Sequence, residues 1–175
     1  IGMIGAGSWG IALTWLLTNN GHQVTVWSAL EDEIRLLQEK HEQTSKLPGV
    51  ILADSVSFTT SLKEAVKGRD LLVLAVPSPF VRSTAHQLRD VVEEKQIIVN
   101  VAKGIEEKTL MTLSEVIEEE IPQAQVAVLS GPSHAEEVGK GVPTTIVAGA
   151  KTRSAAEKIQ NIFMSPVFRV YTSPD

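Results

Sequence analysis

Three glycines near the start of the chain have the spacing of a nucleotide-binding turn. Gly5, Gly7 and Gly10 follow a short apolar run, Ile1–Ile4, and precede residues 9–20, whose apolar residues recur at helical spacing. Gly5 permits a tight turn, Gly7 lets the backbone approach a pyrophosphate, and Gly10 lets the helix pack close to the strand. Glycine turns also occur for structural reasons alone, but the strand before and the helix after this one favour dinucleotide binding.

The residue that would hold the adenosine ribose of such a ligand is not evident. An acidic residue after the second strand commonly bonds the ribose 2′-hydroxyl, and an arginine there accommodates a 2′-phosphate. Here Ala29 and Leu30 occupy that region, and the first acids, Glu31 and Asp32, fall inside the next predicted helix. The sequence therefore leaves the choice between NAD and NADP open.

Two later loops carry further polar groups. Lys103 and Gly104 end the apolar run Ile97–Ala102, and Gly131 and Ser133 follow the run Val126–Leu129. A lysine in this position could polarise a carbonyl group, although most lysines are simply solvated. Ser28, Ser61, Thr112 and Ser133 have the spacing of helix caps. At Ser133, this role is compatible with ligand binding at the same helix start.

These loops need a scaffold of alternating strands and helices. The strands are predicted at residues 1–4, 23–27, 71–76, 97–102, 126–129, 144–148 and 168–171, with helices at 9–20, 28–41, 61–68, 80–89, 112–120, 133 onward and 154–163. Residues 42–57 are predicted to be an irregular connection. Buried strands that alternate with helices indicate an α/β fold with a doubly wound, mainly parallel, Rossmann-type sheet and helices on both faces. Ligands of such sheets bind outside the carboxyl ends of the strands.

Length and composition limit the classes of protein that remain. The chain has 175 residues, a net charge of −5, 43% hydrophobic residues and 21% charged residues. These values are typical of one globular domain and exclude a disordered chain. The acidic balance argues against nucleic acid as a partner. The longest apolar run, Leu71–Val76, is far shorter than the ~18 residues of a membrane span.

Several kinds of site are not expected. The chain has no cysteine, which removes disulfides, thiolate metal sites and cysteine nucleophiles. No group of His, Asp and Glu has metal-ligand spacing, and Glu118–Glu120 is expected to be a solvated helix end. No signal-peptide pattern precedes the first strand. Because the chain opens on Ile1 inside that strand, we expect a few natural N-terminal residues to be missing.

Three segments together resemble the bacterial NAD(P)-dependent glycerol-3-phosphate dehydrogenases. They are Gly5–Gly10 (GAGSWG), Val99–Glu106 (VNVAKGIE) and Leu129–Val138 (LSGPSHAEEV), in the order in which that family has them. The resemblance covers the whole chain. It implies that residues 1–175 are the NAD(P)-binding domain and that the family's C-terminal helical domain is absent from this chain.

The resemblance also implies roles for individual residues. Ser8 and Trp9, together with the three glycines, match cofactor contacts in the phosphate loop, and Phe80 matches an aromatic residue beside the nicotinamide. Lys103 matches a catalytic lysine near both cofactor and substrate. Gly131 and Ser133 match substrate contacts, and Ala135 matches a further cofactor contact. The family commonly has basic residues where Ala29 and Leu30 stand.

The activity implied is reversible hydride transfer between NAD(P)H and dihydroxyacetone phosphate, giving sn-glycerol 3-phosphate for glycerophospholipid synthesis. The resemblance further implies a cytoplasmic enzyme that is a homodimer at full length. Because the second essential lysine of the family lies in the helical domain, we expect this chain to bind cofactor but to be nearly inactive.

Three alternatives stay open at this point. The first is a related two-domain dehydrogenase of the 6-phosphogluconate or 3-hydroxyacyl-CoA type, which a substrate panel would identify. The second is a non-catalytic module that senses the nicotinamide redox state, in which Lys103 would be dispensable. The third is a Rossmann domain retained for structure or interaction, which would have no affinity for the cofactor.

Overall fold

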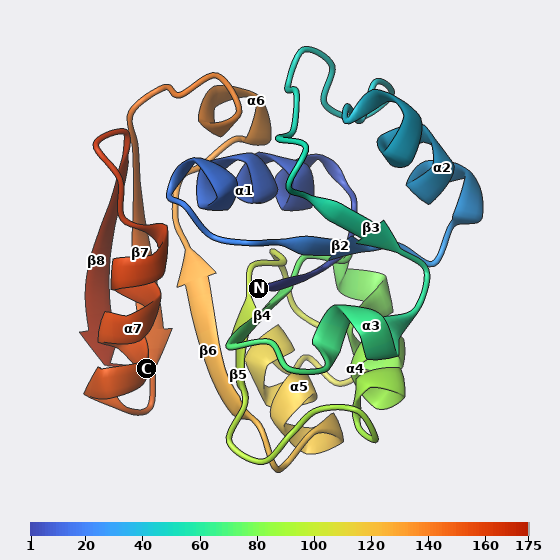
Figure 1. The fold of residues 1–175 in the computed structure, drawn as a ribbon. Helices are drawn as coiled ribbons and strands as arrows, with labels where there is room; N and C mark the ends of the chain where they lie inside the picture. The colour runs from blue at the N-terminus through green and yellow to red at the C-terminus, as the bar shows by residue number, and fades with distance from the viewer. Residues whose placement is uncertain (175) are drawn as a thin grey trace.

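A computed structural model describes residues 1–174 and contains one eight-stranded sheet. The strands are β1 (Gly2–Ile4), β2 (Thr25–Trp27), β3 (Ser57–Thr59), β4 (Leu71–Leu74), β5 (Ile97–Asn100), β6 (Gln125–Ser130), β7 (Thr144–Ala150) and β8 (Phe168–Pro174). The helices are α1 (Ser8–Asn19), α2 (Glu31–Lys40), α3 (Leu62–Val66), α4 (Val81–Leu88), α5 (Leu113–Glu120), α6 (Ala135–Val138) and α7 (Arg153–Phe163), with a 3₁₀ turn, η1, at Ser78–Phe80. Figure 1 shows these elements.

The strand order, β3-β2-β1-β4-β5-β6-β7-β8, confirms the predicted fold class. Every neighbouring pair from β3 to β6 is parallel. β7 then runs antiparallel to β6, and β8 runs parallel to β7. The chain builds outward from β1 to β2 and β3 on one side, and then crosses to the other side of β1 to add β4, β5 and β6. This is the arrangement of a doubly wound sheet.

Helices bury both faces of the sheet, because the central strands are apolar on both sides. Along β4, Leu71 and Val73 belong to one buried cluster, whereas Leu72 and Leu74 belong to the other. The first cluster is completed by α1, α2, α6 and α7, and the second by α3, α4 and α5. A continuous apolar run is therefore what a central parallel strand requires.

The short strand β3 was not predicted. Ser57 ends the segment expected to be irregular and residues 58–59 follow it, yet all three pair in parallel with β2. Ser57 is exposed, and Phe58 and Thr59 are only half-buried, so no apolar run marks this edge strand. Hydrogen bonding to β2 decides its conformation, and local sequence does not.

Two of the predicted helix caps form and two do not. Ser61 accepts a hydrogen bond from the Glu64 amide, and Thr112 forms a complete capping box that begins α5. The predicted cap at Ser133 is wrong, because α6 begins after His134 and Ser133 Oγ instead donates to the Gly131 carbonyl. The box predicted at Ser28 is also wrong, since α2 begins after Leu30 without a side-chain cap.

The acidic end of α5 is not simply solvated, which corrects the expectation for Glu118–Glu120. The Glu120 carboxylate is only 12% exposed and pairs with Arg82, Arg89 and His86 of α4 and its end. Glu118 pairs with Lys151. These contacts join α5 to α4 and to the start of α7.

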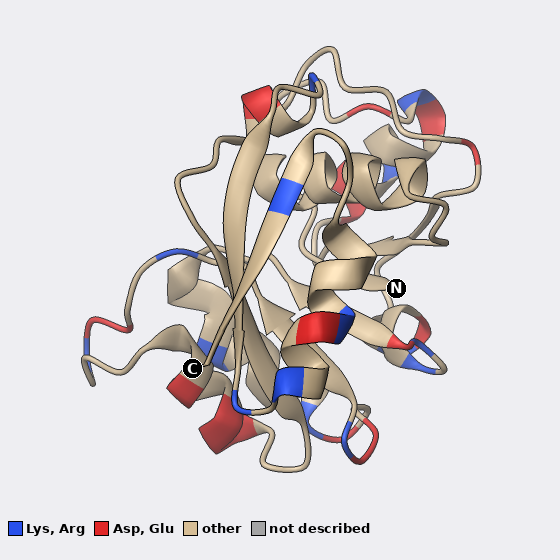
Figure 2. Ribbon diagram, turned by 90° about the vertical axis from the view of Figure 1, so that its left-hand side faces the viewer, with Lys and Arg blue, Asp and Glu red and all other residues tan. Residues whose placement is uncertain are grey.

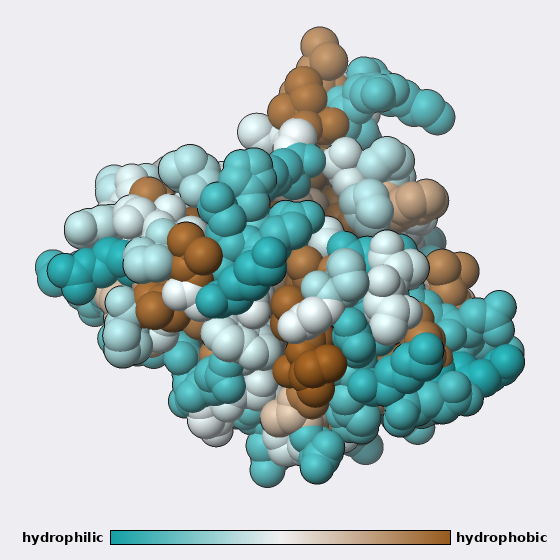
Figure 3. All heavy atoms as spheres, turned by 90° about the horizontal axis from the view of Figure 1, so that it is seen from above, coloured by the Kyte–Doolittle hydropathy of each residue, from teal (hydrophilic) through white to brown (hydrophobic). Residues whose placement is uncertain are grey.

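The surface is mixed in character. Charged residues lie mainly on helices and loops, while the visible strands are largely uncharged (Figure 2). From above, apolar atoms form small patches separated by hydrophilic atoms (Figure 3). Within residues 1–174, every helix is too short or too polar to cross a membrane.

Candidate functional site

The carboxyl ends of four adjacent strands bring the predicted loops together. β1, β4, β5 and β6 are consecutive and parallel in the sheet, so the loops that follow them share one edge. These loops carry the glycine-rich turn, the segment ending at Phe80, the segment with Lys103, and the segment from Gly131 to Ser133. This edge is the candidate site.

The glycine-rich turn, Gly5–Gly10, has the geometry expected of a phosphate loop. Gly5 has φ +125°, which other residues rarely adopt, and a Cβ on Gly10 would lie 2.2 Å from the Gly5 carbonyl oxygen. A Cβ on Gly7, in contrast, would meet no atom of residues 1–174 within 4 Å. Two glycines are thus required by packing, and the third borders open space where a ligand could approach the backbone.

The residues beside this turn also fit a nucleotide. Ser8 and Trp9 begin α1, whose free N–H groups favour a negative charge. Trp9 packs partly against the core, and its indole Nε1 is buried without a hydrogen-bond partner among the described residues. Buried Gln43 donates to the Ala6 carbonyl at 3.2 Å and so fixes the turn from the side of α2.

Lys103 connects two of the loops. Its ammonium nitrogen lies 3.2 Å from the carbonyl oxygen of Gly131 and 3.2 Å from that of Ser133. The turn that delivers it is closed by buried Asn100, whose Oδ1 accepts from the Ala102 amide, and by Gly104 at φ +110°. The Lys103 ammonium group and the carbonyls of Gly131 and Ser133 are therefore held together at this edge of the sheet.

The predicted substrate and cofactor contacts on the β6 side are less open. Ser133 and Ala135 are both buried, 5% and 8% exposed, and Ala135 packs in the core as the first residue of α6. A Cβ on Gly131 would lie 3.1 Å from the Ile146 Cα, so this glycine lets the loop pass close to β7. The ligand contacts of these three residues stay predictions beside these packing roles.

Phe80 lies at the outer rim of the site. It ends η1 just before α4 and is 58% exposed. Two residues later, Arg82 reaches across to the loop of Lys103 and binds Glu106 through two hydrogen bonds, of 2.7 and 2.8 Å. Helix α4 and the loop after β5 are therefore joined by a bidentate ion pair.

This pair belongs to a larger network. Arg82 also bonds Glu119 and Glu120 of α5. Hydrogen bonds from Arg82, and then from Thr109, lower the pKa of Glu106 to about 2. The pKa of Glu120 is also lowered, first by its hydrogen bond with His86. The Glu106 and Glu120 carboxylates are therefore ionised at neutral pH.

A second polar cluster stands at the end of β2. Glu33 Oε2 accepts from Ser28 Oγ at 2.5 Å, and Oε1 accepts from Gln43 Nε2 at 2.9 Å and contacts Lys46. The Glu33 side chain is only 9% exposed. Through Gln43, this cluster is continuous with the phosphate loop at Ala6.

Comparison with known proteins identifies the family. Residues 1–156 match the model described as the N-terminus of NAD-dependent glycerol-3-phosphate dehydrogenase. The chain belongs to this family. A relative from Agathobacter rectalis, named glycerol-3-phosphate dehydrogenase [NAD(P)+], is 63% identical over the whole chain, and one of the same name from Fusobacterium nucleatum is 54% identical. The chain spans about half of each relative, 52% and 53% of their lengths.

Solved structures agree with this assignment. A glycerol-3-phosphate dehydrogenase from Coxiella burnetii matches 97% of the chain, and the chain covers 52% of it, with a TM-score of 0.92 and 28% identity. The enzyme from yeast shares the fold, with a TM-score of 0.87 and 24% identity over 98% of the chain and 55% of its own. The family match disfavours the 6-phosphogluconate and 3-hydroxyacyl-CoA alternatives.

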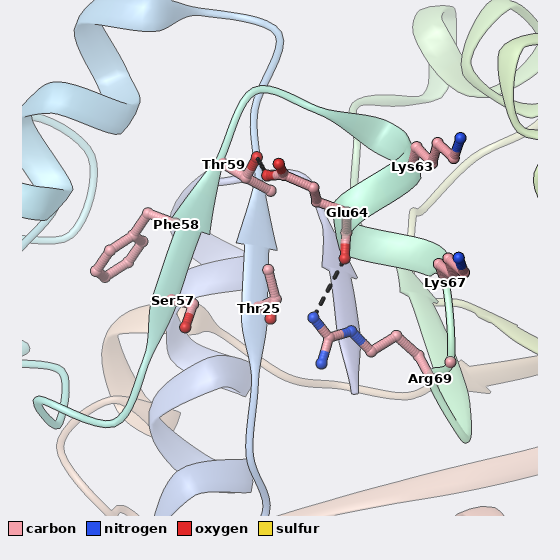
Figure 4. Close-up of a pocket in the computed structure, with 9 residues that line it drawn as sticks. Thr25, Ser57, Phe58, Thr59, Lys63, Glu64, Lys67 and Arg69 are labelled. Carbon is pink, nitrogen blue, oxygen red and sulfur yellow. Dashed lines mark hydrogen bonds between the residues drawn. The ribbon is translucent and has the colours of Figure 1, made fainter.

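A cavity of about 660 Å³ lies apart from this site, along β3 and α3 (Figure 4). Its lining includes Thr25 and Ser57, which begin their strands, so it extends toward the amino edge of the sheet. The Arg69 guanidinium points into it and donates to the Glu64 carbonyl at 3.2 Å. This cavity contains none of the residues predicted to act on cofactor or substrate.

Several residues around the site were not predicted. Arg82, Glu33 and Gln43 contact the loops from elements distant in sequence, and no local motif marks them. Asn100 had a usable signal, because it is a polar residue inside an apolar strand run. Within residues 1–174, no group of His, Asp and Glu is arranged to hold a metal ion.

Proposed function

We propose that this chain is the cofactor-binding half of a glycerol-3-phosphate dehydrogenase that interconverts dihydroxyacetone phosphate and sn-glycerol 3-phosphate with NAD(H) or NADP(H). The full-length enzyme would be a cytoplasmic homodimer that supplies glycerophospholipid synthesis, with a helical substrate domain beyond residue 175. The observation that carries the proposal is the position of Lys103, whose ammonium group contacts the Gly131 and Ser133 carbonyls at the ligand-binding edge.

Lys103 has the chemistry that the reaction needs. A lysine ammonium has three N–H donors, and two of them are directed to the loop carbonyls. The remaining donor is available to a substrate carbonyl oxygen. Because negative charge develops on that oxygen during reduction, a fixed ammonium stabilises the transition state more than the ground state.

The cofactor would be held by Gly5, Gly7, Ser8, Trp9 and Gly10. The open space at Gly7 and the start of α1 suit a pyrophosphate, and Trp9 packs partly against the core beside this turn. The bound nicotinamide supplies or accepts the hydride. Phe80 would border its ring from the rim, and Ala135 would contact the cofactor from α6.

Gly131 and Ser133 would contact the substrate. Their carbonyls fix the Lys103 ammonium, so the lysine and the substrate loop are placed together and not independently. This coupling would keep the reacting carbonyl within reach of one donor.

The direct test is substitution of Lys103 by Met in the full-length enzyme. We expect kcat to fall by ~10²–10³-fold, comparable to the loss of one oxyanion-stabilising donor. Lys108→Met, an exposed lysine five positions along the same loop, is the matched control and should leave kcat unchanged. Equal activity of both variants would exclude Lys103 from catalysis and favour the sensing module.

Titration of this chain with NADH and NADPH provides a second test of the proposed function. We expect the chain to bind at least one cofactor while showing negligible steady-state reduction of dihydroxyacetone phosphate. Measurable turnover by residues 1–175 alone would contradict the division of roles between two domains. No binding of either cofactor would contradict the proposal itself.

A further inference from the structure

We propose that Glu33, with its partners Ser28, Gln43 and Lys46, makes this protein bind NADH in preference to NADPH. We call these four residues the β2-end cluster. The inference rests on the proposed function, because it assumes that the phosphate loop holds a nicotinamide dinucleotide. It assigns a specificity role to a residue on α2 and not to the position directly after β2.

The cluster lies where the adenosine ribose is expected. In a doubly wound sheet the ribose next to adenine lies between the phosphate loop and the end of the second strand. Ser28 directly follows β2, and Gln43 donates both to Glu33, at 2.9 Å, and to Ala6 of the phosphate loop, at 3.2 Å. The Glu33 carboxylate is thus fixed next to both the phosphate loop and the end of β2, between which the ribose would lie.

The charges around the cluster are unfavourable to an additional phosphate. The first turn of α2 contains three carboxylates, on Glu31, Asp32 and Glu33. Two cations accompany them: Arg35 pairs with Asp32, and Lys46 pairs with Glu33. Three negative charges against two positive ones leave a net charge of −1, and both cations are already engaged.

Among residues 1–174, the positions that flank this cluster supply no further cation paired with it. Ala29 and Leu30 occupy the positions between β2 and α2. On the β3 side, Thr59 donates to the Glu64 carboxylate at 2.6 Å, which places another negative charge beside the strand that pairs with β2. Lys63 extends away from Thr59 (Figure 4).

A 2′-phosphate and a 2′-hydroxyl would therefore meet very different environments. The phosphate adds between one and two negative charges. It could recruit Lys46 only by taking that cation from Glu33, whose carboxylate is 9% exposed and would then lack its counter-charge. A neutral hydroxyl adds no charge and leaves every bond of the cluster in place.

The experiment is an equilibrium titration of this chain with NADH and with NADPH, in which binding is measured by fluorescence or calorimetry. For the unaltered protein we expect NADH to bind at least ~10-fold more tightly than NADPH at low salt. The deficit of NADPH should shrink as salt is added, because screening weakens the repulsion. A merely steric exclusion would not respond to salt.

Two variants test the residues themselves. Glu33→Gln keeps the shape of the side chain and releases Lys46, so the NADPH to NADH ratio of affinities should rise several-fold. Leu30→Arg places a cation at a position that is 60% exposed, where folding is not at risk, and should raise NADPH affinity alone. Glu39→Gln is the matched control, since it removes the same charge from an exposed side chain near the other end of α2.

The outcomes separate this inference from the proposed function. Binding of neither cofactor would overturn the proposed function. Binding of NADPH as tightly as NADH by the unaltered protein would overturn the inference and leave the proposed function intact. A ratio that is unchanged in Glu33→Gln, or changed equally in Glu39→Gln, would remove Glu33 as its cause.

Discussion

The phosphate loop and the loop that follows Lys103 are held in place by different means. In the phosphate loop, backbone and glycine sterics fix the conformation: Gly10 packs directly on the Gly5 carbonyl, and no side chain could replace either hydrogen. Residues 104–112 are instead held by side chains from other elements, mainly Arg82 through its pair with Glu106. Within this second loop, the main-chain bonds are the Glu106 amide to Met111 and the Leu110 amide to Glu106.

The difference teaches how each loop responds to change. A loop fixed by sterics fails when an atom is added, and it is insensitive to pH and salt. A loop fixed by ion pairs fails when a partner is removed and responds to protonation. The glycine-rich loop of the candidate site therefore belongs to the rigid scaffold, whereas the loop that follows Lys103 depends on its polar supports.

The largest effect is expected from Gly10→Ala. Its Cβ would lie 2.2 Å from a backbone oxygen, so we expect a loss of about 3 kcal/mol in the free energy of unfolding. Gly7→Ala is the matched control: its Cβ meets open space, so stability should barely change while cofactor binding weakens. Denaturant melts and cofactor titrations measure both, and equal destabilisation of the two variants would contradict the steric account.

Removal of Arg82 should loosen the second loop. In Arg82→Ala, the Glu106, Glu119 and Glu120 carboxylates lose a shared partner, and the Glu106 and Leu110 amides should exchange with deuterium faster. Arg153→Ala, which breaks a pair on exposed α7, is the control and should leave those amides unchanged. Unaltered exchange in Arg82→Ala would mean that main-chain bonds suffice.

A smaller effect is expected at the end of the same loop. Thr112 caps α5, so Thr112→Ala should cost about 1 kcal/mol of stability. Ser114→Ala, inside the first turn, removes a similar hydroxyl without a capping role and should be close to neutral. If thermal or denaturant melts gave the two variants the same loss, the capping box would not be stabilising α5.

The smallest effect is a dependence on acid. Because the folded-state pKa of Glu106 is lowered from 4.5 to about 2, its contribution to stability is complete above pH 4.5 and is lost as the pH falls toward 2. Glu106→Gln should therefore show a shallower decline of Tm across that window than the unaltered protein. Glu107→Gln, the neighbouring exposed carboxyl, should keep the steeper decline.

The fold was predictable where burial is strong. Runs such as Leu71–Leu74 and Ile97–Asn100 are apolar on both faces and can only be central strands, so the sheet followed from them. β3 escaped prediction because its pairing with β2, and not its own composition, makes it a strand. The reversed direction of β7 likewise depends on the sheet edge that it meets, which no local pattern encodes.

The site was predictable to the extent that backbone geometry defines it. The roles of Gly5 and Gly10 follow from their spacing, and both positions have the tight packing expected. The resemblance pointed to Lys103, but the carbonyls that hold it became visible only when β5 and β6 lay side by side. Arg82 and Glu33 could not be found, because each acts across more than one element of the fold.

The reversal between β6 and β7 marks a seam in the sheet, and we expect it to separate two units that unfold independently. β7, α7 and β8 form a unit whose two strands pair along their full lengths, whereas β6 pairs with β7 only over Ala127–Ser130. Residues 144–174 are therefore bonded more extensively to one another than to the larger part of the sheet, and we expect them to detach together in partial unfolding. Gly131 packs on Ile146 at the seam, so such an opening would release the carbonyls that hold Lys103 and switch off the site before the nucleotide half is disturbed.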